Sequence, residues 1–427
     1  MSHASSLRCG LLGAALLLAL GAAAQPAAPS PPLPPLSLER AQALALAHSP
    51  MLRAAQHGVA ASEGGLLQSR ARPNPELSYT QEDTRGSSRT STLQWSQPIE
   101  IGGKREARMR VAEHGRDLAR AELAAARAVL QAEVRSAFFG LLAAQQRVAL
   151  SRQTLDIAAS ARAAAASRVA AGKSAPLEET KASVAESGAR LELSQAQSGL
   201  RVARQQLQAL WGGGAEPIAG FGAAEGAIDE LPPVPEAAVL QQRLELAPAV
   251  LRARQLLEQS RAAAELERAR RLPDPTLSLG VKRAREAQES GRNQLVFGIS
   301  VPLPLFDDNQ GNQLQALRRA DQAEDELLAV HAQLQAQLQE AREQWQTSRE
   351  QAEQLARQVL PAAQSAYEAA ARGFTLGKFG YLDVLDAQRT WSEARSQYLN
   401  QLLATHRAAA SVDRLLGSGQ PPLSPAP

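Results

Sequence analysis

The sequence predicts a mainly α-helical protein with a small β part, in which one unit of helix, β-hairpin and long helical hairpin occurs twice. Three observations support this fold class. Aromatic residues make up only 4% of the chain, whereas Ala, Gln, Leu, Arg and Glu dominate, a balance that suits long helices. The segment RPNPELSYTQE (72–82) returns 200 positions later as LPDPTLSLGVK (272–282). Apolar residues recur at a spacing of seven over long stretches of both halves, as in coiled coils.

Composition also excludes several classes of function. A net charge of +3 over 427 residues does not suggest a nucleic-acid-binding protein. The chain has a single cysteine, Cys9, so the mature protein is expected to have no disulfide and no thiolate metal site. The histidines show no ligand spacing such as HxxxH, and no nucleotide-binding or triad motif is present. We therefore predict no enzymatic activity, no cofactor and no resident metal.

The first 36 residues are predicted to be a targeting segment followed by a leader. Residues 1–24 have the form of a secretory signal peptide, with an apolar core at 11–20 and the small residues Ala22–Ala24 before the cleavage point. This apolar run is shorter than the roughly 20 residues that a membrane-spanning helix needs. Cys9 precedes the apolar core rather than following it, so we expect no lipid anchor. Residues 25–36 (QPAAPSPPLPPL) form a Pro-rich leader.

The first structural repeat is predicted to cover residues 37–211. A helix from Ser37 to about residue 70 precedes two strands of alternating polarity around 77–81 and 93–97. From Lys104 to about Ala171 the helical pattern is unbroken, which corresponds to roughly 100 Å of helix, and a return helix follows over 176–211. Its heptad rows are Val134, Leu141, Val148 and Leu155, with Leu123, Leu130, Ala137 and Ala144 four residues earlier.

A Gly/Pro-rich linker at 212–237 separates this unit from a second structural repeat at 238–417, and residues 418–427 are predicted to be a flexible tail. The second repeat contains a strand pair that ends in NQLVFGISVPLPLF (293–306) and a long helix that Gly377-Lys378 interrupts, followed by a final helix to about Leu416. The heptad row of the long helix is Leu338, Trp345, Ala352 and Val359, with Leu327 and Leu334 in the companion row.

The predicted strands have one apolar and one small or polar face. Lipid-exposed sheet edges are not tolerated, and single-chain membrane barrels begin near eight strands. Four strands therefore either pack on the helices in water or join strands of other chains in a shared barrel. In the second case the lipid-facing residues are Leu77, Tyr79, Leu93, Trp95, Leu277, Leu279, Leu295 and Phe297.

Both long helices are interrupted in the same way, at GKSAPLE (172–178) and GKFGYLD (377–383). Glycine permits the chain reversal, and the lysines could satisfy the last helical carbonyls or bond to the backbone of a partner. The alternative is that these residues only make a turn between helices. The candidate tip residues are Gly172, Lys173, Ser174, Leu177, Glu178, Gly377, Lys378, Tyr381, Leu382 and Asp383, with Asp383 and Asp386 as possible entrance charges.

Several of these segments together resemble one protein family. They are similar to the TolC-like outer-membrane efflux protein family. The segments that carry this resemblance are LSLERAQALALAHSPMLRAA, the pair RPNPELS and LPDPTLS, VPLPLF and LGKFGYLDVLDAQRTW. SQPIEIGGKREAR (96–108) and PLPLFDDNQG (302–311) resemble its heavy-metal branch, the CzcC type, although Asp307-Asp308 stands where that branch usually has a basic or neutral residue.

The resemblance implies a homotrimer in the outer membrane of a Gram-negative bacterium, with a twelve-stranded β-barrel in the lipid on an α-helical periplasmic tunnel. It further implies a passive duct that exports heavy-metal cations. Its partners would be a periplasmic adaptor (membrane fusion) protein, which meets the tips at residues 171–179 and 376–383, and a proton-driven inner-membrane resistance-nodulation-division pump. Drug efflux or type I protein secretion through the same architecture is one alternative. A periplasmic coiled-coil adaptor or scaffold is another, against which the duplication argues.

Overall fold

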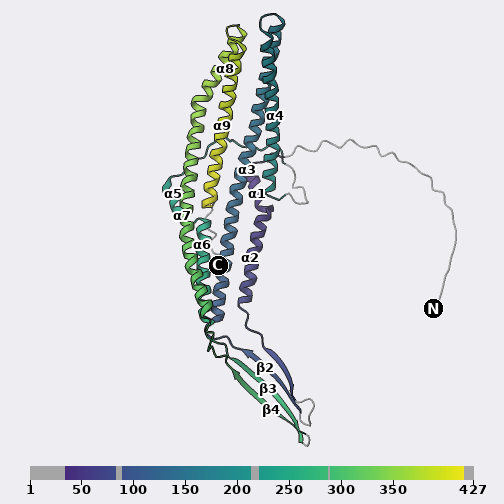
Figure 1. The fold of residues 1–427 in the computed structure, drawn as a ribbon, viewed down its shortest axis with the longest axis vertical. Coiled ribbons are helices and arrows are strands. Elements are labelled where there is room, and N and C mark those ends of the chain that lie inside the picture. Colours follow the sequence, from purple (N-terminus) through teal and green to yellow (C-terminus); the bar gives the residue numbers. More distant parts are fainter. Residues whose placement is uncertain (1–33, 83–88, 213–220, 287–288, 418–427) are drawn as a thin grey trace, which may run out of the picture.

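The computed structural model describes residues 34–82, 89–212, 221–286 and 289–417. The predicted signal peptide, all but the end of the Pro-rich leader, and the predicted tail lie outside these residues. The molecule is long and narrow, with a β-sheet at one end and two helix reversals at the other (Figure 1). In the described segments, no helix has both the length and the apolar character that are needed to cross a membrane.

The sheet has four antiparallel strands in the order β1-β2-β3-β4. β1 (Glu76–Glu82) and β2 (Arg89–Pro98) form the first hairpin, and β3 (Thr276–Glu286) and β4 (Glu289–Ser300) form the second. Both predicted hairpins are therefore confirmed. They are joined side by side through β2 and β3, where Trp95 lies opposite Leu279 and Leu93 opposite Val281. β1 and β4 are left as the two free edges of the sheet.

The helices follow the predicted duplication. In the first half α1 is Leu38–His48, α2 is Pro50–Ser69, α3 is Lys104–Ala170 and α4 is Pro176–Ala209. In the second half α5 is Ala237–Leu244, α6 is Pro248–Ala269, α7 is Gln310–Gln354, α8 is Leu360–Thr375 and α9 is Tyr381–Leu416. The predicted unbroken helix after Lys104 is confirmed, since α3 runs for 67 residues.

The prediction of one helix from Ser37 to about residue 70 was wrong. Helix α1 ends at His48, and Ser49 is extended (φ −62°, ψ 123°) before Pro50 begins α2. A residue that precedes proline is disfavoured in the helical region because the proline ring clashes with it. Ala247 before Pro248 has the same extended backbone (φ −62°, ψ 138°), so this break also belongs to the repeated unit.

The long helix of the second half also differs from its prediction. One π-helical turn, η1 (Leu355–Val359), separates α7 from α8, and Pro361 lies in the first turn of α8. Proline lacks a backbone N–H and its ring clashes with the preceding turn, and a wider π turn is one way in which a helix absorbs such a residue. The change of register leaves Val359 38% exposed, so it does not continue the buried row predicted for it.

The core lies along the seams between the helices. Leu130, Val134 and Leu141 of α3 are each 1% exposed or less and belong to one cluster, as their heptad row predicts. Leu334, Leu338 and Trp345 of α7 are buried in a second cluster with residues of α5 and α9. The sequence period therefore identified buried residues near the middle of both long helices, whereas Val148 and Leu155 farther along α3 are half-buried.

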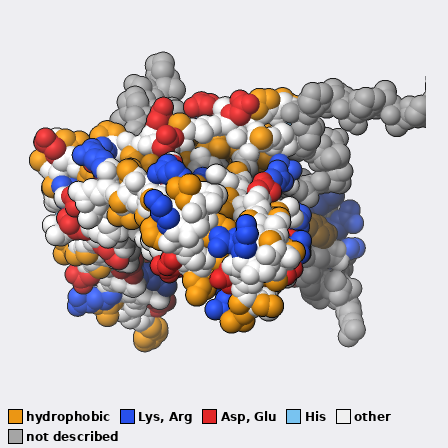
Figure 2. Space-filling model, turned by 90° about the horizontal axis from the view of Figure 1, so that it is seen from above, with side chains coloured by type: hydrophobic (Ala, Val, Ile, Leu, Met, Phe, Trp, Pro, Cys, Tyr) orange, Lys and Arg blue, Asp and Glu red, His pale blue; other side chains and the backbone are white. Residues whose placement is uncertain are grey.

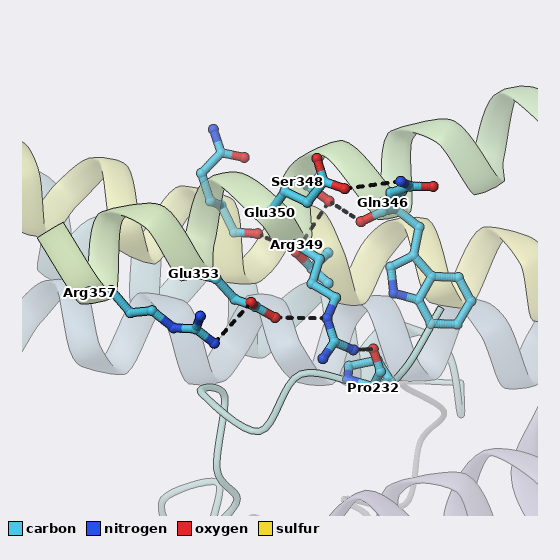
Figure 3. Close-up of polar contacts among 10 residues, drawn as sticks. Pro232, Gln346, Ser348, Arg349, Glu350, Glu353 and Arg357 are labelled. Carbon is cyan, nitrogen blue, oxygen red and sulfur yellow. Dashed lines mark hydrogen bonds and ion pairs between the residues drawn. The ribbon is translucent and has the colours of Figure 1, made fainter. Parts of the chain in front are cut away.

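The described part of the linker, residues 221–235, forms a strap across the helices. At one end it runs beside the leader, where Leu36 and Ala224 form a parallel bridge. Farther along, Nη1 of Arg349 donates to the Pro232 carbonyl at 2.6 Å, and Nε of Arg342 donates to the Pro235 carbonyl at 3.3 Å. Figure 3 shows Arg349 lying between this carbonyl of Pro232 and the carboxylate of Glu353. Arginine side chains of helix α7 thus bind backbone carbonyl groups of the strap.

A buried histidine of α9 also holds the strap. His406 is 2% exposed, its ring stacks on Phe139 at 3.6 Å between centroids, and its Nε2 lies 2.9 Å from the Ile228 carbonyl. A carbonyl only accepts, so Nε2 carries the proton. Burial lowers the pKa of His406, the bond to Ile228 opposes this shift, and the positive charge of Arg135 adds to it.

Acid is therefore expected to weaken the attachment of the strap. Because the folded-state pKa of His406 is below the ordinary value of 6.5, the unfolded chain binds more protons between the two values. The stability from neutral His406 is present above pH 6.5 and is lost as pH falls through the folded-state pKa. Melting temperatures of the wild type should fall more between pH 8 and pH 5 than those of His406→Phe, which keeps an aromatic ring but cannot titrate. Equal slopes would contradict this assignment.

Candidate functional site

The two helix reversals lie next to each other at the end of the molecule opposite the sheet (Figure 1). Gly172 follows α3 with φ +69°, and Gly377 follows α8 with φ +71°. Such left-handed backbone is accessible to glycine without the steric penalty of a Cβ atom. The predicted role of both glycines in reversing the chain is therefore confirmed.

The two reversals share the same closing hydrogen bond. The backbone N–H of Lys173 donates to the Arg168 carbonyl at 2.8 Å, and that of Lys378 donates to the Gly373 carbonyl at 2.8 Å. This hydrogen bond, from a backbone N–H to the carbonyl five residues earlier, closes a helix C-terminus in the Schellman motif. The last carbonyls are thus satisfied by the main chain of each lysine, and both side chains are exposed at the tip.

Substitution of either glycine is expected to loosen its reversal. A Cβ atom added to Gly377 would meet no other atom within 4 Å, so the cost of Gly377→Ala is backbone strain alone, about 1–2 kcal/mol. We expect faster hydrogen exchange at the amides of Lys378 and Phe379, with exchange in the sheet unchanged. Gly311→Ala is a matched control, since it also has open space but not a positive φ. Unchanged exchange at the tip would contradict the assigned role.

A small apolar cluster joins the two helical hairpins just below the reversals. Tyr381 is 1% exposed and packs with Phe374 and Val384 of the second hairpin and with Ala165 and Ala182 of the first. The structure therefore buries the Tyr381 side chain inside the tip of the single chain. The sequence analysis named Tyr381 as a candidate tip residue, and the first turn of α9 directs its side chain between the hairpins.

Arg168 reinforces the same junction from α3. Its guanidinium lies 4.7 Å from the centroid of the Phe374 ring, and its Nη1 donates to the Phe374 carbonyl at 3.3 Å. A cation over an aromatic ring is attracted by the negative face of the ring. The two hairpins are therefore tied together at the tip by both apolar and charged contacts.

Four large apolar side chains within five residues of Gly172 or Gly377 are exposed. Leu177 is 60% and Leu382 is 54% exposed, as the sequence predicts. Leu376 (71%) and Phe379 (49%) are also exposed and were missed by the sequence analysis, although their positions beside Gly377-Lys378 could have indicated them. Figure 2 looks down the long axis from the end with the two reversals and shows apolar side chains among basic and acidic groups. We call these four residues the apolar tip.

Acidic residues at the tip have different roles. Oδ2 of Asp383 accepts from the backbone N–H of Gly380 at 2.9 Å, so Asp383 closes the first turn of α9. Asp386 is exposed, Glu178 is half-buried in the first turn of α4, and Ser174 is half-buried in the turn before it. In the described segments, no group of three or more His, Cys, Asp or Glu residues is placed to hold a metal ion.

At the opposite end, the strand register places the predicted lipid-facing residues on one face of the sheet. Leu77, Trp95, Leu279 and Phe297 form one row across the strands, and Tyr79, Leu93, Val281 and Leu295 form the next. Except for the half-buried Leu277, these side chains are 44–82% exposed. An apolar sheet face of this extent, left uncovered in a single chain, indicates a surface that contacts other apolar material.

Comparison with known proteins agrees with this arrangement. The family described as "Outer membrane efflux protein" matches residues 42–213 and 239–418, one match for each structural repeat. The cobalt-zinc-cadmium resistance protein CzcC of Cupriavidus metallidurans is 48% identical over 382 residues, which is 90% of each chain. The nickel-cobalt-cadmium resistance protein NccC of Alcaligenes xylosoxydans xylosoxydans is 30% identical over 68% of this chain and 65% of its own.

Solved structures with the same fold include outer-membrane channels. Crystal structures of CusC give a TM-score of 0.76 with 21% identity, and cover 90% of this chain and 92% of theirs. The outer-membrane channel OprN gives 0.76 with 20% identity over 90% of both chains. The open-state MtrE channel of Neisseria gonorrhoeae gives 0.75 with 20% identity, over 90% of this chain and 89% of MtrE.

Proposed function

The chain belongs to the outer membrane efflux protein family, and from this premise we propose that it is the outer-membrane duct of a tripartite system that exports heavy-metal cations. The observation that carries the proposal is 48% identity, over 90% of both chains, with a cobalt-zinc-cadmium resistance protein. The family match to both halves also removes the alternative of a periplasmic adaptor or scaffold. We propose no catalytic step and no resident cofactor.

We propose that three copies assemble around one axis. The unpaired edges β1 and β4 support this, because three copies of a four-stranded sheet would close into twelve strands with no free edge. The helical layer supports it as well. Contacts there run from α2 to α3, from α3 to α6 and from α6 to α7, so that α2 and α7 are left at the edges in the same order as the strands.

We propose that the apolar face of the sheet contacts outer-membrane lipid and that the apolar tip contacts a periplasmic adaptor protein. The adaptor would connect the duct to a proton-driven inner-membrane pump of the resistance-nodulation-division class. The secretory signal that the sequence predicts at residues 1–24, with no lipid anchor expected, is consistent with this route. A passive duct needs no tight metal site, since conduction requires that ions leave as readily as they enter.

The cargo is tested with a deletion strain grown on graded zinc, cobalt, cadmium, copper and silver beside a panel of drugs and detergents. We expect hypersensitivity to metals with raised cellular metal content, restored by the wild-type gene, and unchanged tolerance to drugs. Drug sensitivity with normal metal content would keep the duct and replace its cargo. Fractionation gives an independent test of the architecture, because a soluble periplasmic monomer in place of an outer-membrane trimer would exclude the duct.

A further inference from the structure

The apolar face of the sheet changes character abruptly toward the end that is distant from the helices. Two successive rows across the strands are apolar, and the next row on the same face contains Arg283, Ser91, Gln81 and Asn293. One row farther, Arg285 lies directly opposite Arg89. Side chains two apart in a strand share a face, so these arginines stand on the face that is proposed to contact lipid, at its outer rim.

The three arginines are close together. Arg89 and Arg285 are cross-strand partners, and like charges in that relation repel one another. A Cβ atom built on Gly291 would lie 2.9 Å from Cγ of Arg285 and 3.3 Å from Nε of Arg283. The missing side chain of Gly291 therefore leaves room in which Arg283 and Arg285 lie side by side. We call Arg89, Arg283 and Arg285 the arginine rim.

The contacts that the rim makes with side chains described by the structure are with neutral groups. Nη2 of Arg89 donates to the amide oxygen of Gln81 at 2.7 Å, and the Tyr79 hydroxyl donates to the same oxygen at 3.0 Å. These contacts orient Arg89 without supplying a negative charge. All three side chains are exposed. An anion that lies between neighbouring arginines such as Arg283 and Arg285 can accept hydrogen bonds from both.

We propose that the arginine rim binds the phosphate groups of glycolipids in the outer leaflet of the membrane. The inference rests on the proposed outer-membrane location. The helices extend from the opposite end of the sheet (Figure 1), so the rim lies at the side of the membrane away from the periplasm. Guanidinium matches phosphate bidentately, and the aliphatic stems of Arg283 and Arg285 can extend over the apolar face while their heads reach the headgroup layer.

The opposite face of the sheet supplies a matched control. Lys282 pairs with Thr92 and Gln294, and Arg292 pairs with Ala284. Both lie at the height of the rim but on the alternate face, with the small and polar residues of the strands. The control is therefore the double variant Lys282→Gln with Arg292→Gln. It removes two positive charges, as Arg283→Gln with Arg285→Gln does, but from the other face of the sheet.

The test uses the full-length protein purified from outer membranes in neutral detergent, with bound lipid counted by native mass spectrometry. The probes are bis-phosphorylated lipid A and its dephosphorylated form. Each arginine near an anionic surface contributes about fivefold in binding, so we expect the wild type to prefer the phosphorylated form at least tenfold. In the rim double variant, Arg283→Gln with Arg285→Gln, this preference should fall at least tenfold. In the control double variant, Lys282→Gln with Arg292→Gln, it should stay within twofold of the wild type.

Retention of the preference in the rim double variant, or equal loss in the control, would overturn the proposal. If the double variant does not assemble, the single variants Arg283→Gln and Arg285→Gln are each expected to lose about fivefold. Metal resistance separates this inference from the proposed function. A wild type that confers resistance but binds both glycolipids equally refutes only the rim, whereas a wild type that is absent from outer membranes refutes both.

Discussion

Replacement of Leu177 and Leu382 by glutamate is expected to abolish metal resistance while the protein still assembles in the outer membrane. Both side chains are more than half exposed, so folding loses little buried apolar area. In a complex with the adaptor, each buried leucine would contribute about 2 kcal/mol, and a carboxylate in its place would be desolvated at further cost. We expect the affinity for the adaptor to fall more than a hundredfold, measured by co-purification with the adaptor and by growth on zinc and cobalt.

Leu191→Glu is the matched control for this prediction. Leu191 lies on the same helix as Leu177, is 66% exposed and receives the same new charge, but it is distant from the reversal. It should leave resistance and co-purification intact. Full resistance in the double variant would refute a contact between the apolar tip and a partner, and loss of the trimer in that variant would move the defect from docking to assembly.

Truncation of Tyr381 to alanine is expected to separate the two hairpins at the tip. The ring is 1% exposed and fills the cluster that contains Phe374 and Val384. Loss of a large buried aromatic side chain costs about 3–5 kcal/mol, because the surroundings close the cavity only in part. Hydrogen exchange at the ends of α4 and α8 should accelerate strongly, whereas exchange in the sheet and the strap should not change.

Tyr381→Phe gives the opposite expectation. Among the described residues, the buried Tyr381 hydroxyl has no hydrogen-bond partner, and an unsatisfied buried hydroxyl costs about 1–3 kcal/mol. Removal of the oxygen should therefore leave the tip as protected from exchange as in the wild type, or more so. If Tyr381→Phe were as damaging as Tyr381→Ala, the hydroxyl would have a role that packing does not explain.

Local chemistry explains what the sequence predicted well. The heptad rows of α3 identified Leu130, Val134 and Leu141 as buried, and the alternation of the strands identified the exposed apolar face. Gly172 and Gly377 identified both reversals, because the ability of a residue to adopt left-handed backbone depends on its own side chain. These features depend on neighbours in the chain and therefore recur in each half of the duplication.

The sequence by itself thus determined the duplication, the strand pairs, the unbroken length of α3 and the points at which the long helices reverse. Only the tertiary structure decided which side chains at those points are accessible. Tyr381 and Leu382 are adjacent in the chain, yet one is buried and the other exposed, because the first hairpin covers only one side of α9. His406 likewise receives its carbonyl partner from Ile228, 178 positions away. Contacts between distant segments fix these assignments, and no local period encodes them.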